Sequence, residues 1–166
     1  MKGHRIPLNG IEMYYETDGA GEPLLLLHGA TGCHENWVHA GRDRLAQDYS
    51  LILPDARGHG RTSNHQKVIT HRQCALDTLA LLDRLGVREC RAIGLSMGGN
   101  ILLHMATLEP ERVRAMVLVS ATMHFPEQAR AIMRQVPAAD AQPPQAWESM
   151  RKSHKLGDDQ IIALWD

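Results

Sequence analysis

Residues 91–100 read RAIGLSMGGN and contain the pattern Gly-x-Ser-x-Gly, with Ser96 between Gly94 and Gly98. This pattern commonly places a reactive serine on a sharp turn between a strand and a helix. Here it follows a strand-like apolar run and precedes a run with helical spacing, which is the context that the motif requires. The two glycines leave room for a strained turn that larger side chains would block. The stretch therefore predicts an exposed Ser96 at a helix N-terminus, with an ordinary strand-to-helix serine as the alternative.

Outward from this stretch, the chain alternates between strand-like and helix-like segments. Asn9-Gly10, which favours a tight hairpin turn, lies between two extended runs at 4–8 and 11–17. Further strands are expected at 23–29, 50–55, 89–95 and 114–121, and helices at about 34–48, 68–85 and 96–110. We therefore predict an α/β fold with an N-terminal β-hairpin and a mostly parallel sheet that carries helices on both faces.

The overall composition excludes several classes of partner. The 166 residues carry a formal net charge of -1, which gives no electrostatic basis for binding nucleic acid or an anionic membrane. Three cysteines without a C-x-x-C spacing favour reduced thiols over a disulfide framework or a zinc site. The N-terminus lacks an apolar signal segment, and the longest apolar run is too short to span a bilayer. A cytoplasmic protein without nucleic-acid or membrane partners is the expectation.

The segment His28-Gly29-Ala30 follows the LLLL strand and is expected at the same edge of the sheet as Ser96. Backbone N–H groups of Ala30 and Met97 could together stabilise a developing oxyanion. For the His28 side chain, a buried and hydrogen-bonded position in the loop is favoured over a role in proton transfer.

A second loop, DARGHGRTS at 55–63, follows the next strand. It is neither a complete G-x-G-x-x-G nor a P-loop, so no nucleotide site and no cofactor are predicted. Asp55 and Arg57 are expected to fix this loop through hydrogen bonds and an ion pair.

The chain resembles the α/β-hydrolase superfamily in the order and spacing of three segments, LLLLHGATG, DARGHGRTS and GLSMGG. The resemblance is closest to the cofactor-free branch that contains serine esterases, lactonases and C–C hydrolases. The resemblance implies that Ser96 is the nucleophile and that Ala30 and Met97 supply the oxyanion hole, with Gly94 and Gly98 supporting the turn. Dehalogenase and epoxide-hydrolase relatives carry aspartate at the position of the serine, so Ser96 argues against those reactions.

The resemblance divides the chain into two parts: an incomplete hydrolase core at 1–121 and a partial helical cap at 122–166. Relatives continue with two more strands, whose loops carry the triad acid and then the histidine. Here Asp140 followed by His154 reproduces that order, but neither follows a strand. His124 follows the last predicted strand, but no acid is evident to orient it. The chain is therefore expected to be an N-terminal fragment, inactive alone, that lacks the last strands of the sheet.

Two alternatives remain open. A metal site is disfavoured because the candidate pairs His34/His39, His59/His65 and His65/His71 do not follow the i, i+4 spacing of H-E-x-x-H. A non-catalytic protein of the same fold would use the pocket for a ligand and the open sheet edge, at about 115–119, for a partner chain. That edge could also support self-association or receive a complementing C-terminal segment. If the chain is an enzyme, its expected partner is a small-molecule carbonyl substrate.

Overall fold

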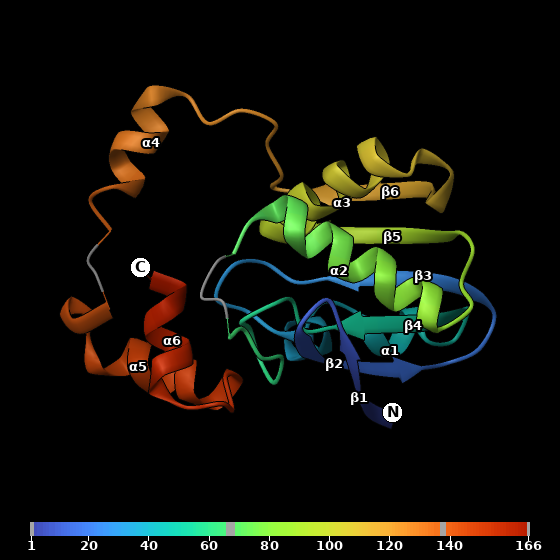
Figure 1. The fold of residues 1–166 in the computed structure, drawn as a ribbon, viewed down its shortest axis with the longest axis horizontal. Coiled ribbons are helices and arrows are strands. Elements are labelled where there is room, and N and C mark those ends of the chain that lie inside the picture. The colour runs from blue at the N-terminus through green and yellow to red at the C-terminus, as the bar shows by residue number, and fades with distance from the viewer. Residues whose placement is uncertain (1, 66–68, 137–138, 166) are drawn as a thin grey trace.

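The computed structural model describes residues 2–65, 69–136 and 139–165 and confirms the predicted α/β architecture (Figure 1). One six-stranded sheet has the order β1-β2-β4-β3-β5-β6. Four neighbouring strands, β4, β3, β5 and β6, run parallel to one another. The two N-terminal strands, β1 and β2, run antiparallel to their neighbours. The strands are β1 (Lys2–Leu8), β2 (Ile11–Asp18), β3 (Glu22–Leu27), β4 (Tyr49–Pro54), β5 (Cys90–Leu95) and β6 (Val113–Val119).

The N-terminal hairpin forms as its turn sequence predicts. Asn9 and Gly10 have φ of 45° and 74°, the two positive values that a type I′ turn requires. The central strand β3 carries four consecutive leucines, and each is at most 4% exposed. Such a continuous apolar run is typical of a parallel strand that is covered on both faces.

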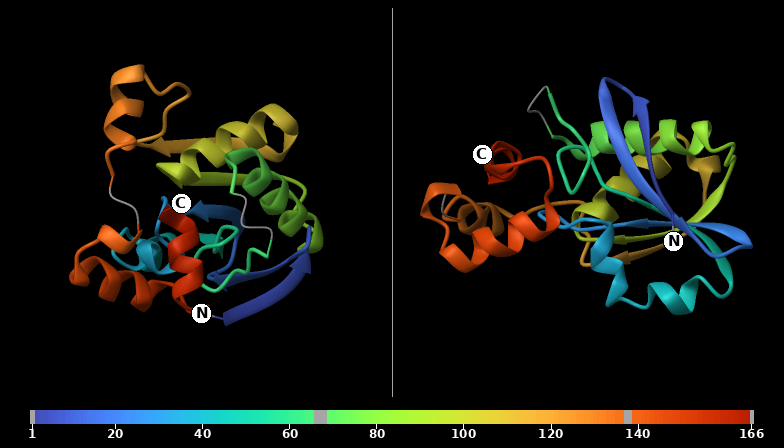
Figure 2. Two further views of the ribbon diagram at one scale, coloured as in Figure 1. Left: turned by 60° about the vertical axis from the view of Figure 1, so that its left-hand side comes forward. Right: turned by 90° about the horizontal axis from the view of Figure 1, so that it is seen from below.

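Helices cover the two faces of the sheet (Figure 2). On one side α2 (His71–Arg84) and α3 (Met97–Leu108) pack together, and their core includes Leu25, Leu27, Leu82 and Met105. On the other side the short helices η1 (His34–Val38) and α1 (Arg42–Leu45) lie near a smaller core of Leu24, Leu26, Trp37, Leu51 and Leu53. Alternate leucines of β3 therefore serve opposite layers.

One predicted helix is wrong. Residues 34–48 form the two short helices η1 and α1 instead of a continuous helix. Gly41 separates them with φ of 89°, a left-handed conformation that interrupts a right-handed helix. The helix predicted at 68–85 is confirmed as α2, with Thr70 as its N-cap and Gly86 after its end.

Strand β6 forms an apolar edge of the sheet, since no described strand pairs with its outer side. Its residues Met116, Val117, Leu118 and Val119 are between 39% and 55% exposed. A long exposed apolar edge is unusual in a monomeric protein, because it offers unpaired backbone groups and uncovered side chains together.

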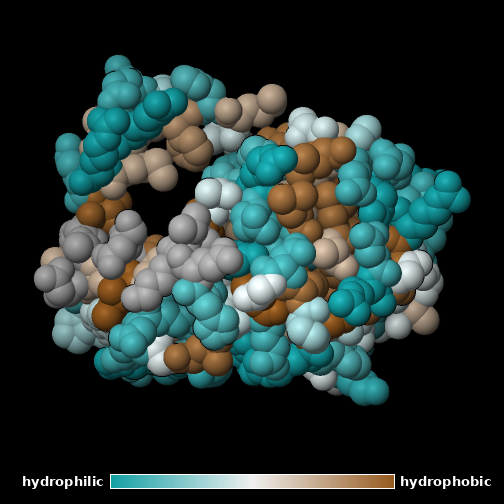
Figure 3. Space-filling view, viewed as in Figure 1, coloured by the Kyte–Doolittle hydropathy of each residue, from teal (hydrophilic) through white to brown (hydrophobic). Residues whose placement is uncertain are grey.

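After β6 the chain forms a helical segment without strands among its described residues. The helices of this segment are α4 (Glu127–Met133), η3 (Ala139–Ala141), α5 (Pro144–Ser153) and α6 (Asp158–Trp165), whereas the short helix η2 (Pro110–Arg112) directly precedes β6. In the space-filling view α4 stands away from the core (Figure 3). Within the described ranges, no helix is long and apolar enough to cross a membrane.

Candidate active site

Ser96 lies on a strained turn between β5 and α3. Its φ and ψ are 50° and -111°, and a positive φ in a non-glycine residue costs on the order of 1–3 kcal/mol. The Ser96 N–H donates a hydrogen bond of 2.7 Å to the carbonyl of Val119 on the neighbouring strand. The residue is exposed although Met97 and Gly98, which follow it, are buried. The predicted strand–turn–helix geometry is thus present.

Close backbone packing explains the two glycines of the motif. A Cβ atom on Gly98 would overlap the carbonyl of Leu27 and lie 2.7 Å from that of His28. A Cβ atom on Gly94 would lie 2.5 Å from the carbonyl oxygen of Gly98. Because these contacts are with backbone rather than with movable side chains, neither position accommodates a larger residue without a shift of the turn.

The loop after β3 lies directly beside this turn. A Cβ atom built on Gly29 would be 3.6 Å from the Cβ atom of Ser96. Neither the N–H of Ala30 nor that of Met97 has a hydrogen-bond acceptor among the described residues. Both groups remain available for an acceptor that is not part of the chain, and Met97 begins α3, whose N-terminus favours negative charge.

His28 has the structural role that the sequence favours. The side chain is 1% exposed, its Nδ1 lies 2.8 Å from the Gly29 carbonyl, and the Ala56 N–H donates to its Nε2 over 2.9 Å. These partners place the proton on Nδ1. Burial holds the pKa of His28 below its ordinary value, so the ring stays neutral and fixes the loop.

The loop after β4 is fixed by Asp55 and Arg57, as expected. The Asp55 carboxylate accepts hydrogen bonds from the N–H and Nδ1 of His34 and from the N–H of Arg61, all within 2.8 Å. Arg57 forms its buried ion pair with Asp77 of α2 through two hydrogen bonds of 2.8 Å. The position of this partner depends on the tertiary fold and is not visible in the local sequence.

His34 belongs to a cluster of potential metal ligands that the spacing of histidines in the sequence does not predict. Cys33, His34 and Asp55 bring metal-ligand atoms within 4.8 Å of one another. However, the ring of His34 already contacts Asp55 through Nδ1 at 2.7 Å and Glu16 through Nε2 at 3.2 Å. Burial disfavours the protonated imidazole and lowers its pKa, but the carboxylates of Asp55 and Glu16 stabilise the protonated form more strongly. The net effect is that the pKa of His34 is raised. These contacts favour a buried charged network over a metal centre.

Among the described residues, no hydrogen bond joins Ser96 to a candidate triad histidine. His154 is 2% exposed, its Nδ1 accepts from the Gly60 N–H at 2.9 Å, and its Nε2 donates to the Thr31 carbonyl at 3.0 Å. Both ring nitrogens are therefore occupied by backbone groups. The side chain of Asp140 lies outside the described residues, and His124 is exposed on the segment after β6.

The sequence pattern of the family described as "alpha/beta hydrolase fold" matches residues 22–156. This range contains the Ser96 turn and both loops of the site. The chain belongs to the α/β hydrolase family. Its family membership accounts for the parallel sheet and for the strand–turn–helix at Ser96.

Relatives at the level of sequence include several enzymes. The chain is 36% identical over 131 residues to a Bacillus subtilis (strain 168) protein provisionally named 2-succinyl-6-hydroxy-2,4-cyclohexadiene-1-carboxylate synthase, with 75% of this chain and 47% of the relative aligned. It is 33% identical over 128 residues to the 2-hydroxymuconate semialdehyde hydrolase of Pseudomonas sp. (strain CF600), with 75% and 45% aligned. This α/β hydrolase chain therefore spans about half the length of these relatives.

Solved structures of the same fold extend the comparison. A hydrolase from Pseudomonas aeruginosa PA01 superposes with a TM-score of 0.76 and 23% identity, and the match covers 98% of this chain and 71% of that chain. At this identity the similarity establishes the fold alone. The relatives together place the chain in a lineage of α/β hydrolases.

Proposed function

We propose that this chain is the nucleophile-bearing part of a serine hydrolase that transfers an acyl group from an ester, thioester, lactone or related carbonyl compound to water. The observation that carries the proposal is the exposed Ser96 beside two backbone N–H groups that have no acceptor within the described part of the chain. A hydrolysis of this class needs an accessible nucleophile next to donors for the oxyanion.

In the proposed reaction, the Ser96 hydroxyl oxygen attacks the substrate carbonyl carbon and its proton passes to a histidine base. The oxygen of the tetrahedral intermediate accepts hydrogen bonds from the N–H groups of Ala30 and Met97. The free N–H groups at the start of α3 add a favourable potential for this negative charge. The side chains of Ala30 and Met97 need no particular chemistry, because only their backbones act.

The base and its acid are proposed to come from a separate segment that completes the sheet. Residues 1–121 would then form the hydrolase core and residues 122–166 part of a helical cap. The exposed edge of β6 is the expected pairing site for the complementing segment, since a parallel strand added there would cover Met116–Val119. Without that segment, the loss of the base and acid together is expected to leave very little activity.

A fluorophosphonate probe, which reacts with activated serines, tests this proposal. The chain should react slowly alone and rapidly when joined to a segment that contributes a strand, an acid, a second strand and a histidine. Mass spectrometry should locate the adduct on Ser96, and Ser96→Ala should abolish it. Ser120→Ala is the matched control, because Ser120 also has a positive φ and is exposed but follows β6. Unchanged slow reaction of the completed chain would refute the catalytic role.

A second candidate function is a non-catalytic protein of this fold that binds a partner chain. The exposed apolar edge of β6 favours it, because strand addition to such an edge is a common mode of recognition. This function predicts no adduct at Ser96 in any form of the protein, together with burial of β6 in a complex. Hydrogen exchange should show protection of the β6 amides under either function, so the presence or absence of the Ser96 adduct distinguishes the two outcomes.

A further inference from the structure

The end of helix α5 is bound to two loops of the core through one histidine, His154. The helix ends at Ser153, and His154 continues in an extended conformation with φ of -104° and ψ of 117°. Its buried ring accepts a hydrogen bond from the Gly60 N–H at Nδ1 and donates one to the Thr31 carbonyl from Nε2. The next residue adds a backbone bond, because the Lys155 N–H donates to the Gly60 carbonyl at 2.9 Å. A short stretch after α5 therefore contacts both the loop after β3 and the loop after β4.

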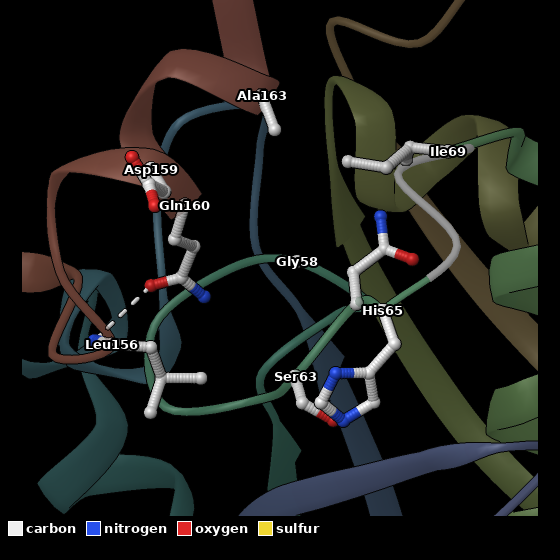
Figure 4. A pocket seen from close by; sticks show the side chains of 9 residues that line it. Gly58, Ser63, His65, Ile69, Leu156, Asp159, Gln160 and Ala163 are labelled. Atoms are coloured by element: carbon white, nitrogen blue, oxygen red, sulfur yellow. Dashed lines mark hydrogen bonds between the residues drawn. The ribbon is translucent and has the colours of Figure 1, made fainter.

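Helix α6 follows this stretch and makes a further contact with the loop after β4. The side chain of Gln160 donates to the Thr62 carbonyl at 3.1 Å and accepts from the Leu156 N–H at 3.4 Å (Figure 4). Beside this bond lies a cavity of about 230 Å³, lined by Ser63 on the loop side and by Asp159 on the side of α6. A cavity reduces the packing between the two elements, so hydrogen bonds carry more of the contact.

The two bonds of the His154 ring require a neutral imidazole. A backbone N–H can only donate, so Nδ1 presents a lone pair to Gly60, and the single ring proton lies on Nε2 and faces Thr31. A protonated ring carries hydrogens on both nitrogens, and its Nδ1–H would then point at the N–H of Gly60. Because the side chain is only 2% exposed, water is not at hand to accept that hydrogen bond. The position of α5 seen here therefore excludes the charged ring.

Two charged side chains act on this ring, and they oppose each other. Asp55, on the loop after β4, favours a positive charge on His154, whereas Lys155, on the same stretch as the ring, disfavours it. The Asp55 carboxylate is already paired with His34, whose pKa is raised. Burial outweighs the help from Asp55 and from the Thr31 carbonyl and holds the pKa of His154 below its ordinary value.

The other titratable groups near this ring do not supply a negative charge. The ring centroid of His59 lies 5.9 Å from that of His154, and His28 follows at 5.2 Å from His59. Burial keeps both of these rings neutral by lowering their pKa values. In the loop after β3, burial raises the pKa of Cys33 to about 11, so its thiol is neutral as well. On the two helices, the exposed Arg151 and Asp158 pair with each other at 2.6 Å.

We propose that His154 is a pH-sensitive contact: the neutral ring holds α5 and α6 against the two loops, and its protonation in mild acid releases both helices while the sheet stays folded. A released ring is in water and has the ordinary pKa of histidine, about 6.5, so release becomes more favourable as the pH falls below that value. The backbone of Thr31 favours release too, because its φ of 58° is strained and can relax once the bond to His154 is broken.

Amide hydrogen exchange at about pH 7.5 and about pH 5.5, corrected for the intrinsic pH dependence of exchange, tests the proposal. Protonation of a group with an ordinary histidine pKa favours the released state about tenfold between these values. The protection of α5 and α6 amides should therefore fall about tenfold at the lower pH. This opening should respond little to low concentrations of urea, because it exposes little surface, whereas exchange of β3 amides requires unfolding of the sheet and should increase with urea.

Three variants complete the test. His154→Asn keeps an acceptor for the Gly60 N–H but does not titrate, so its α5 and α6 protection should be equal at the two pH values. His154→Gln places its amide closer to the Thr31 carbonyl and should behave alike, which covers the case in which one of the two variants fails to fold. His59→Asn removes the neighbouring titratable ring and should retain the tenfold response.

Several results would overturn the proposal. The first is an unmodified chain whose α5 and α6 protection is the same at both pH values. The second is a fall that depends on urea as strongly in α6 as in β3, because the whole protein would then be unfolding. The third is a tenfold fall that persists in His154→Asn and His154→Gln, or that disappears in His59→Asn, since either would assign the proton to another group.

Discussion

The pH dependence of stability should be governed in large part by one buried histidine, His59. Its side chain is 2% exposed, and its Nδ1 lies 2.9 Å from the Arg57 carbonyl. Its ring centroid lies 5.2 Å from that of His28 and 5.9 Å from that of His154. Burial, followed by the proximity of His28, lowers the pKa of His59 to about 3. The native protein therefore excludes a proton that the unfolded chain accepts.

The sign and size of the effect follow from this difference. The ordinary pKa of histidine is about 6.5, so the contribution of His59 is complete above that pH and falls as the pH decreases toward 3. At about pH 5 the unfolded state gains roughly thirtyfold from protonation, which corresponds to about 2 kcal/mol. His28 and His154 act in the same direction, because burial lowers their pKa values too, whereas the nearby Asp55 opposes these shifts.

Urea unfolding at about pH 7.5 and about pH 5 measures the effect. The variant His59→Asn keeps an amide donor for the Arg57 carbonyl but does not titrate in this range. Its loss of unfolding free energy between the two pH values should be about 2 kcal/mol smaller than that of the unmodified chain. His39→Asn, at an exposed position, should match the unmodified chain. An equal loss in His59→Asn would refute the reasoning, whatever its stability at neutral pH.

Three further predictions concern stability. Asp77→Ala should lower the free energy of unfolding by about 3–5 kcal/mol in urea titration, because Arg57 would remain buried without its partner; a loss below about 1 kcal/mol would contradict this. Ser96→Gly should raise it by about 1 kcal/mol, since glycine tolerates the positive φ, and thermal unfolding that shows no gain would argue against backbone strain. Gly98→Ala should cost about 1–3 kcal/mol because of its overlap with the Leu27 carbonyl, and unchanged thermal stability would show that the turn can shift freely.

The strands are the most predictable part of the fold. Four short apolar runs, and Asn9-Gly10 between the first two strands, carry strong local signals, and the structure contains all the expected strands. The helix expected at 34–48 is wrong because apolar spacing outweighs a single glycine in the prediction. Gly41 could be taken as a break, but its positive φ is set by the loop in which it lies. Local patterns thus predict the elements better than their boundaries.

The candidate site is predictable where the backbone defines it and not where side chains meet across the fold. The motif locates the Ser96 turn and its neighbouring loop, since both depend on short local sequences. The partner of Arg57 and the network around His34 are not foreseen. Each joins residues from distant parts of the sequence, and their proximity exists only after the sheet has formed.

The hydrogen bonds of His154 couple the end of α5 to two loops that precede it by 94 and 123 residues in the sequence. Its ring binds Gly60 on one side and the carbonyl of Thr31, which follows Ala30, on the other. If the end of α5 moves away, both bonds break and the loop beside Ser96 loses a constraint. Reciprocity then requires that a molecule that orders this loop must, by the same free energy, also favour the docked position of α5. The helical segment and the loop therefore form one thermodynamic unit.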